Sequence, residues 1–472
     1  MTRPPSIPVD LWDAIPPTLQ PAIAAVVAGL EARNARLEAR VADLEARLIQ
    51  TSANSSRPPS ADPPHAKPAP PRPPSGKRRG GQPGHPKHER VLLPPDEILH
   101  HKPTRCRRCA GRLAGDDPAP LAHQVHDVPL VRPHVTEHRR HRLTCPGCGA
   151  VTCAPVPTDA ATGYGPRARA VCALLSGGCR LGKRAVSQLM GDLFGLPVSP
   201  AAVCALQADT AAALAPIHAA ALDFTRTQPA NVDETGWTQG RTKAWLWVAV
   251  TAPVTAFLLR LTRGRTAFDD LVGGTPPVLT TDRYGVYDHL PTARRQVCWA
   301  HLRRDFQAMI DRRNAGAGIG EELLAHADIL LRQWKRVRDG TLSPEGFRRS
   351  YLSWVRAEVR GLLARGAASG CAKTAATCRE VLGVEAALWT FADVPGVEPT
   401  NNAAERAVRH AVCWRKTSYG TDSEAGSRFV ERILTVIASC RQQGRSVLEF
   451  LTAAVQAARI GATPPSLIPA GA

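Results

Sequence analysis

The 472-residue sequence has no uncharged apolar run that reaches the roughly 18 residues of a membrane-spanning helix. Its first residues, MTRPPSIPVDLWDAIPP, also lack the basic and then apolar pattern of a secretion signal. These two absences argue against a membrane partner and make a cytoplasmic location the expectation. Without secretion, the 13 cysteines are expected to be reduced or metal-bound rather than paired in disulfides.

Lysine and acidic residues are both scarce relative to arginine. Only nine of the 60 basic residues are lysine, and the 41 acidic residues leave a formal net charge of +19. This balance excludes an acidic protein and favours an anionic partner. The planar guanidinium group of arginine suits bidentate contacts with phosphate groups. A phosphate-bearing partner is therefore favoured.

A heptad pattern of apolar residues runs through residues 18–50. Its seam residues alternate at spacings of four and three: Ile23, Val27, Leu30, Asn34, Leu37, Val41, Leu44 and Leu48. Glutamates occupy the e positions and arginines the g positions of the heptad. Asn34 at a core position favours a coiled coil of two helices in a fixed register. The pattern predicts a parallel coiled coil and thus a homodimer or higher oligomer. The alternative is a single amphipathic helix packed on its own domain.

Residues 51–90 consist mainly of proline, serine, glycine and basic residues. This composition cannot bury a core, so it predicts a disordered linker. A basic cluster in the linker comprises Lys77, Arg78 and Arg79. These residues either follow DNA phosphates or belong to a spacer that keeps the modules apart.

Two Cys-x-x-Cys pairs lie within residues 91–158. They are Cys106 with Cys109 and, after 35 intervening residues, Cys145 with Cys148. Two such pairs predict one structural Zn²⁺ held by four thiolates in a zinc ribbon-like module, with strands between the pairs. Cys153, His123 or His126 could replace one ligand. A redox pair is the alternative.

The segment 165–222 is expected to be helical. Helices are predicted at 167–176, at 183–194 and from Ser199 onward, with the break Gly-Leu-Pro-Val-Ser between the last two. Such a pair is typical of a helix-turn-helix DNA-binding unit, but helix pairs of this shape are also common without DNA. Both interpretations remain open.

After Thr227 the pattern changes to β-structure. NVDETGWT, AWLWVAVT and TAFLLRLT predict three strands, followed by a helix over 266–272 and a fourth strand in PVLTTDRYGVYDHL. This order is that of an RNase H-like α/β core, which we assign to residues 226–306 and 399–420. Asp233 is expected to close the first strand and Asp282 the fourth, so that both carboxylates meet at one edge of the sheet.

A third carboxylate is expected from a later helix. Glu405 lies in PTNNAAERAVRHAVCWRK, where Thr400 or Asn401 can cap a helix whose apolar face carries Glu405 inward. Three carboxylates suit two Mg²⁺ or Mn²⁺ ions, which prefer oxygen ligands. The alternative roles are a salt bridge for Glu405 and turn formation for the two aspartates. A helical insertion is predicted at 307–398, and C-terminal helices at 421–460.

Several long segments together carry a family resemblance. They are NSSRPPS, RRGGQPGH, CPGCG, VDETGWTQG, TDRYGVYD, CWAHLRRDF, TNNAAERAVR and SYGTDSEAGSR. From about residue 54 to residue 451 the sequence resembles the IS-sixty-six (IS66) family of bacterial insertion-sequence transposases. The resemblance implies a DDE transposase with Asp233, Asp282 and Glu405 as its metal-binding catalytic triad, and with the four cysteines as zinc ligands. It implies cleavage at insertion-sequence ends and strand transfer into target DNA.

Other residues acquire expected roles from the resemblance or from their place near the three acids. Cys298 and His301 resemble the C/DxxH element of related enzymes, with a packed cysteine and a satisfied histidine as the alternative. Four residues beyond Glu405 are predicted to hold DNA phosphates unless they form a solvated face: Arg406, Arg409, Arg415 and Lys416. Accessory proteins of the same element and association with the bacterial nucleoid are also implied. Two alternatives remain: a domesticated or inactive DNA-binding protein, and a structure-specific RNase H-like nuclease.

Overall fold

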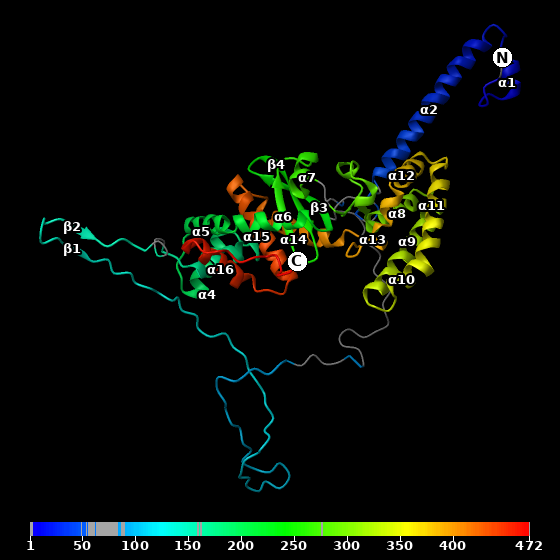
Figure 1. Cartoon of the computed structure of the whole chain (residues 1–472). Helices are drawn as coiled ribbons and strands as arrows, with labels where there is room; N and C mark the ends of the chain where they lie inside the picture. The colour runs from blue at the N-terminus through cyan, green and yellow to red at the C-terminus, as the bar shows by residue number, and fades with distance from the viewer. Residues whose placement is uncertain are drawn as a thin grey trace.

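The computed structural model describes residues 3–48, 50–52, 54, 62, 84–85, 90–157, 160, 163–274 and 277–471. These residues form a helical N-terminal arm, an irregular segment, and a body with most of the helices and a five-stranded sheet (Figure 1). The body thus has the mixed α/β architecture that the sequence predicts.

The N-terminal arm consists of α1 (Val9–Asp13) and α2 (Gln20–Leu48). Helix α2 projects away from the body (Figure 1). Its seam residues Leu30, Leu37 and Val41 are 59%, 54% and 53% exposed in the single chain. The helix predicted at 18–50 is present, and its pairing with a second copy stays a prediction.

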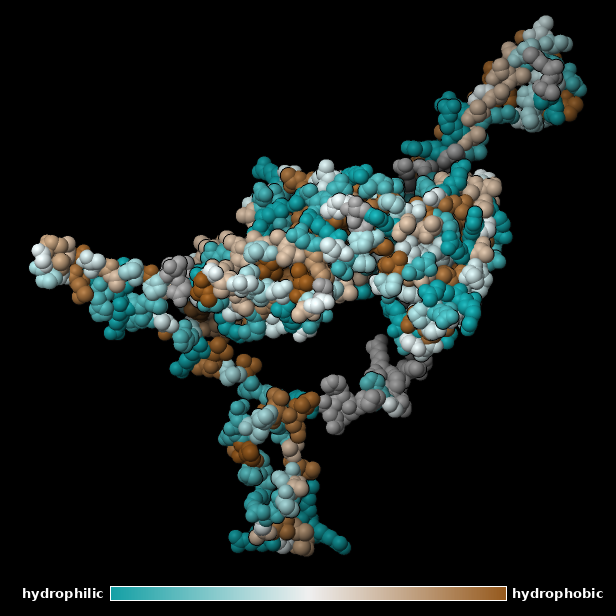
Figure 2. Space-filling model, viewed as in Figure 1, coloured by the Kyte–Doolittle hydropathy of each residue, from teal (hydrophilic) through white to brown (hydrophobic). Residues whose placement is uncertain are grey.

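Residues 90–157 form little regular structure. The strands β1 (Arg142–Thr144) and β2 (Val151–Cys153) pair antiparallel around the second cysteine pair. The prediction of further strands between the cysteine pairs is wrong, because residues 113–141 carry none. Leu121, Val125 and Val128 are between 84% and 101% exposed, and Figure 2 shows such apolar side chains along this segment. Alternating apolar residues need a surface to cover before they form a stable sheet.

Four helices form the module that leads into the sheet: α3 (Pro166–Gly177), α4 (Lys183–Phe194), α5 (Pro200–Ala213) and α6 (Ala215–Arg226). The predicted break between α4 and α5 is confirmed. Gly195 ends α4 at φ +60°, and the Ser199 hydroxyl accepts the backbone N–H of Ala202 at the start of α5. In the part of the chain that the structure describes, no single helix is long and apolar enough to cross a membrane; α5 and α6 reach that length only together, and they are bent by 47° relative to each other.

The sheet contains β3 (Ala230–Gln239), β4 (Thr242–Val250), β5 (Thr255–Arg260), β6 (Leu279–Thr281) and β7 (Arg295–Val297). Its strand order is β5-β4-β3-β6-β7. The first three strands are antiparallel, whereas β6 and β7 join β3 in parallel. The helix α7 (Arg265–Val272) connects β5 to β6. Strand β7 was not expected, and β6 is shorter than predicted because the chain turns immediately after it.

Helix α15 (Glu424–Gln442) covers the outer edge of β5. Acceptors spaced one helical turn apart meet alternate N–H groups of the strand. Glu431 Oε2 accepts the Leu259 N–H, Thr435 Oγ1 accepts the Phe257 N–H, and Ser439 Oγ accepts the Thr255 N–H, each at 3.0 Å. The helix therefore satisfies a strand edge that would otherwise expose unpaired donors.

The remaining helices pack beside and over the sheet. Those after β7 are α8 (Trp299–Asp311), α9 (Ala317–Arg338), α10 (Pro344–Phe347), α11 (Ser353–Ala367), α12 (Ala372–Gly383) and α13 (Thr390–Asp393). They share a hydrophobic core distinct from the main core on one face of the sheet. The predicted insertion is thus helical, although its first helix begins before residue 307. Helices α14 (Asn402–Ser418) and α16 (Val447–Ile460) return to the main core.

Candidate active site

Asp233 and Asp282 lie on neighbouring parallel strands. Asn231 on β3 stands opposite Thr280 on β6, so two residues further along Asp233 stands beside Asp282. Adjacent strands are about 4.8 Å apart, which brings the two carboxylates together. Asp233 does not close its strand as predicted, because β3 stays paired with β4 as far as Gln239. Asp282 follows β6 directly, as predicted.

The start of α14 carries Glu405 to the same place. Residues 399–401 are clamped between β3 and the start of α8. The Trp299 N–H donates to the Pro399 carbonyl at 2.9 Å, and the Asn401 amide donates to the Val232 carbonyl at 2.8 Å. Asn401 holds the N-cap position, but its side chain bonds the strand rather than the helix. Glu405 is thereby fixed one helical turn from β3.

The electrostatics of Asp233 show that the acids act on one another. Burial raises the pKa of the Asp233 carboxyl well above its usual range, and the carboxylates of Glu234, Asp282 and Glu405 add to that rise. A pKa raised by like charges means that the site disfavours its own negative charge. A bound cation would relieve this repulsion.

Several buried polar atoms around Glu405 lack hydrogen-bond partners among the described residues. They are Oε1 of Glu405, Nδ1 of His301 and Oδ1 of Asn401. Glu405 Oε1 lies 3.7 Å from His301 Nδ1, and its Oε2 lies 3.7 Å from an Arg304 nitrogen. Among the described side chains, no three or more His, Cys, Asp or Glu residues already form a metal-binding group. The acids are therefore neighbours, and one carboxylate oxygen of Glu405 is unpaired, but within the described residues they do not form a closed set of metal ligands.

Cys298 and His301 stand at the start of α8, next to Glu405. The Cys298 thiol is buried and accepts the Asn401 N–H at 3.1 Å, and burial raises the pKa of this thiol to about 11. A neutral packed thiol matches the structural alternative for Cys298. His301 faces Glu405 and also lies within electrostatic range of Asp305.

Sequence reasoning missed two residues of this site, Glu234 and Arg304, and it named Asn401 only as a candidate helix cap. The Glu234 side chain is only 2% exposed and binds Arg263. Its signal in the sequence was a second carboxylate directly after Asp233 in a strand. Arg304 follows His301 by three residues on the same face of α8, so both side chains reach Glu405.

The two cysteine pairs adopt the same local turn. In the first turn, the Cys106 N–H donates to the Gly111 carbonyl, and the Ala110 N–H donates to the Cys106 carbonyl. In the second turn, the Cys145 N–H donates to the Ala150 carbonyl, and the Gly149 N–H donates to the Cys145 carbonyl. Backbone N–H groups lower the thiol pKa of Cys106, chiefly that of Cys109, and of Cys145, chiefly that of Gly147. The structure does not bring the two pairs together into one group among the described residues.

The predicted DNA-binding residues occupy different settings. Arg406, Arg409 and Lys416 are exposed on α14. Arg415 instead turns toward β3, beyond the residues of β3 that pair with β6; there its guanidinium group donates to the Gly236 carbonyl, and burial lowers its pKa. Lys77, Arg78 and Arg79 lie outside the described residues.

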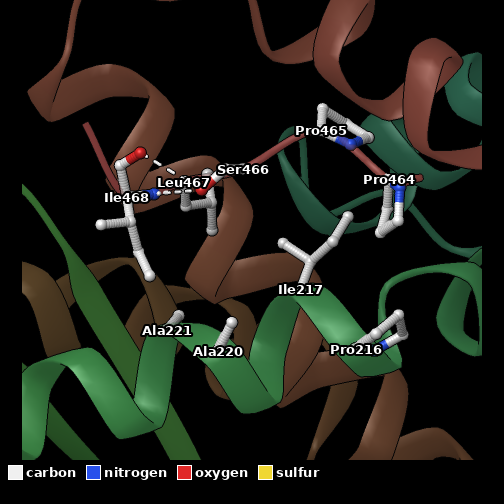
Figure 3. Close-up of a pocket in the computed structure, with 9 residues that line it drawn as sticks. All are labelled: Pro216, Ile217, Ala220, Ala221, Pro464, Pro465, Ser466, Leu467 and Ile468. Atoms are coloured by element: carbon white, nitrogen blue, oxygen red, sulfur yellow. Dashed lines mark hydrogen bonds between the residues drawn. The ribbon is translucent and has the colours of Figure 1, made fainter. Parts of the chain in front are cut away.

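A small apolar pocket of about 110 Å³ lies between α6 and the C-terminal tail (Figure 3). Ile217 and Ala221 of α6 face Pro465 and Leu467 of the tail. None of the acids lines this pocket. It has no polar side chain to orient a ligand beyond Ser466, so we attach no chemistry to it.

Comparisons with known proteins identify the family of the chain. Residues 181–428, more than half of the chain, match the model of the Transposase IS66 family, and residues 11–91 match a family of unknown function, DUF6444. An uncharacterized protein of Sinorhizobium fredii, y4qI, is 28% identical over an alignment of 237 residues, and the match covers 45% of this chain and 43% of that protein. The chain thus spans less than half the length of that relative. From its family match, the chain belongs to the IS66 family of transposases.

Proposed function

We propose that the protein is a DDE transposase that cleaves DNA at insertion-sequence ends and joins the ends to target DNA. The observation that carries the proposal is the meeting of Asp233, Asp282 and Glu405 at one place on the sheet. The order of three antiparallel strands followed by two parallel ones supports an RNase H-like core. Family membership supports the same chemistry.

The residues present suit a pair of divalent ions. The donors are carboxylate oxygens, which Mg²⁺ and Mn²⁺ prefer, and the open atoms on Glu405 and Asn401 could accept an ion or its water. The raised pKa of Asp233 supports a cation there, because positive charge would offset the repulsion among the acids. Asp233, Asp282 and Glu405 would hold the ions, which would supply activation of the attacking hydroxyl and stabilisation of the leaving oxygen.

The residues around the acids set the geometry. His301 and Arg304 approach the two oxygens of Glu405 and limit the directions in which it can turn. The Asn401 side chain ties the helix to β3, and the buried Cys298 thiol accepts the backbone N–H of Asn401. Such fixed positioning is the protein's main contribution to phosphoryl transfer, since the acids form no covalent intermediate.

A basic DNA-binding track would surround the acids. The chain carries a net charge of +19, and Arg406, Arg409 and Lys416 stand exposed on the helix that bears Glu405. Phosphates of the bound strand are the natural partners for these cations. The α4–α5 pair would add a helix-turn-helix contact, and the basic linker a further one.

The proposal includes two assembly elements. Four thiolates from the two cysteine turns would bind one Zn²⁺, because each turn already points N–H groups at one of its sulfurs. A second copy would cover the exposed seam of α2 and form a parallel coiled coil. Two linked active sites suit an enzyme that joins two DNA ends. Accessory proteins of the same element would be further partners.

The decisive experiment compares wild type with Asp282→Asn on a DNA duplex that carries the inverted repeat flanking the gene. We expect Mg²⁺-dependent cleavage and joining by wild type, and a loss of at least about 100-fold in the variant, since even changes in the hydrogen-bond partners of metal ligands cost about 10–100-fold. Asp223→Asn, an exposed residue paired with Arg226, is the matched control and should retain activity.

Three outcomes would contradict the proposal. Cleavage unaffected by Asp282→Asn would remove the catalytic assignment. Hydrolysis without joining would identify a structure-specific nuclease instead. DNA binding with neither reaction, in the presence of both repeats and Mg²⁺, would identify a domesticated DNA-binding protein.

A further inference from the structure

A fourth carboxylate, Glu234, lies next to the triad but faces the other side of the sheet. Successive residues of a strand point to opposite faces. Asp233 therefore faces α14, whereas Glu234 shares the face of Val232, which packs in the core with Phe268 and Tyr287. The Glu234 side chain is 2% exposed. A carboxylate so deeply enclosed must be paired to remain in the fold.

Both oxygens of Glu234 have strong donors from two different loops. Oε1 accepts hydrogen bonds from Nε and Nη2 of Arg263 at 2.8 and 2.6 Å. Oε2 accepts a hydrogen bond from the hydroxyl of Tyr287 at 2.8 Å. Arg263 belongs to the loop after β5, and Tyr287 belongs to the turn that follows β6. A single side chain on β3 thus ties two loops to the strand that carries Asp233.

Arg263 is itself held in place by aromatic rings. Its guanidinium carbon lies 3.8 Å from the centre of the Tyr284 ring and 4.8 Å from that of Trp245. Stacking on two rings and pairing with a carboxylate leave this arginine little freedom. It therefore presents a rigid surface against which the Asp282 turn rests.

The turn that holds Asp282 is fixed from both sides. Its backbone N–H at Tyr284 donates to Oδ1 of Asp282 at 2.8 Å. From β7, Arg295 donates to the carbonyls of Asp282 at 3.0 Å and Tyr287 at 3.2 Å. On the side of the turn that faces β3, the Tyr287 hydroxyl donates to Glu234. Within the described residues, this is the only side-chain hydrogen bond between the turn and β3.

We infer that Glu234 is a positioning residue, which acts through Tyr287 and Arg263 to set the distance and direction of Asp282 relative to Asp233. The inference rests on the proposed function, because it concerns ligands for the divalent ions. Metal ligands on separate chain segments must be held to within about 0.5 Å, and this network supplies the lateral constraint. Glu234 would not bind the ions itself, since its oxygens are already occupied on the far face.

The test measures ion binding directly, apart from catalysis. Mn²⁺ binding to the full-length protein would be followed by electron paramagnetic resonance, for wild type, Tyr287→Phe and Glu234→Gln. We expect Mn²⁺ affinity to fall about 10-fold in Tyr287→Phe, which loses only one hydroxyl. A loss of this size is typical when residues that orient metal ligands are substituted. Tyr164→Phe is the matched control, because its hydroxyl donates to the Pro197 carbonyl far from the acids.

The melting temperature of each metal-free variant separates positioning from general stability. If Tyr287→Phe lowers the melting temperature but binds Mn²⁺ as tightly as wild type, the inference is overturned. Glu234→Gln keeps the shape of the side chain and one acceptor oxygen for Arg263, and its new NH2 group can donate to the Tyr287 hydroxyl oxygen, so it should bind Mn²⁺ with an affinity between those of wild type and Tyr287→Phe. An unchanged affinity in both variants would also overturn the inference.

A parallel measurement on Asp282→Asn distinguishes this inference from the proposed function. Loss of Mn²⁺ binding in Asp282→Asn, with wild-type binding in Tyr287→Phe, would leave the proposed function intact and remove the role of Glu234. Undiminished Mn²⁺ binding in Asp282→Asn would instead overturn the proposed ion site.

Discussion

The acid site and the cysteine segment are built in opposite ways. Asp233, Asp282 and Glu405 come from elements far apart in the sequence, and the packed core brings them together. The four cysteines sit in two tight local turns, on a segment whose apolar side chains are exposed. The core thus sets the geometry of the acids, whereas nothing in the described contacts of the cysteine segment sets the distance between its two turns.

The two regions also differ in how they treat negative charge. Burial and neighbouring carboxylates raise the pKa of Asp233, so the core makes its ionised form costly. Backbone N–H groups lower the thiol pKa of Cys106 and Cys145, so each turn favours a thiolate. We therefore expect metal ions to relieve strain at the acid site, and to create the long-range structure of the cysteine segment.

The largest expected effect is the loss of zinc from Cys145→Ser. Structural Zn²⁺ contributes about 10–16 kcal/mol of apparent binding energy, and a missing thiolate removes a quarter of the ligands. We expect zinc content near one ion per wild-type chain and near zero in the variant, by atomic absorption. The melting of the body should not change, because its core is separate.

Cys179→Ser is the matched control, since Cys179 is also an exposed cysteine but lies outside the two turns. Equal zinc content in wild type and Cys145→Ser would mean that these turns do not bind zinc as proposed. A lower melting temperature of the body in Cys145→Ser would show that the two regions are coupled.

The second largest effect concerns the core. Glu431→Ala should destabilise the body by about 2–4 kcal/mol, because it leaves the Leu259 N–H and the Arg428 guanidinium group without their buried acceptor. The free energy of unfolding by urea measures this loss. Glu424→Ala is the control on the same helix, since Glu424 is 77% exposed and its removal should cost well under about 1 kcal/mol.

If both glutamate variants unfold at the same urea concentration as wild type, the edge of β5 does not depend on α15. In that case the contrast between a core-built site and a locally built segment would weaken, because the sheet would hold its acids without the covering helix.

The sequence predicted the features that local residues determine, and it missed those that depend on distant partners. The first three strands of the sheet, the break at Gly195 and the place of Asp282 were accessible, because each depends on local pattern and turn residues. The position of Asp233 within β3, rather than at its end, was not accessible, since it depends on the pairing with β4. The roles of Glu234 and Arg415 could not be predicted either, because their partners lie far away in the sequence.

A smaller effect is expected on the pH dependence of stability in the absence of divalent ions. Since the pKa of Asp233 is raised in the folded state, folded protein holds this proton more tightly than unfolded protein does. The stabilising contribution is complete below the ordinary carboxyl pKa and is lost as pH rises through the raised value. Asp233→Asn should therefore raise stability at pH 8, by about 1.4 kcal/mol for each unit of pKa difference.

Thermal melting at pH 4 and pH 8, with chelator and then with Mg²⁺, measures this effect. We expect the melting temperatures of Asp233→Asn and wild type to converge at pH 4, and the advantage of the variant at pH 8 to disappear when Mg²⁺ is added. A variant less stable than wild type at pH 8 in chelator would show that the acids do not repel one another.

The smallest effect tests whether the two cysteine turns are equivalent. Both place the residue after the second cysteine in the left-handed region, Ala110 at φ +56° and Gly149 at φ +72°. Alanine pays about 1 kcal/mol there and glycine does not. Because zinc binding and turn formation are coupled, Ala110→Gly should tighten zinc binding about fivefold, and Gly149→Ala should weaken it by a similar factor. Competition with a chromophoric chelator measures both. Opposite changes of similar size would mean that one ion depends on both turns, whereas an effect from only one variant would mean that the turns bind zinc independently.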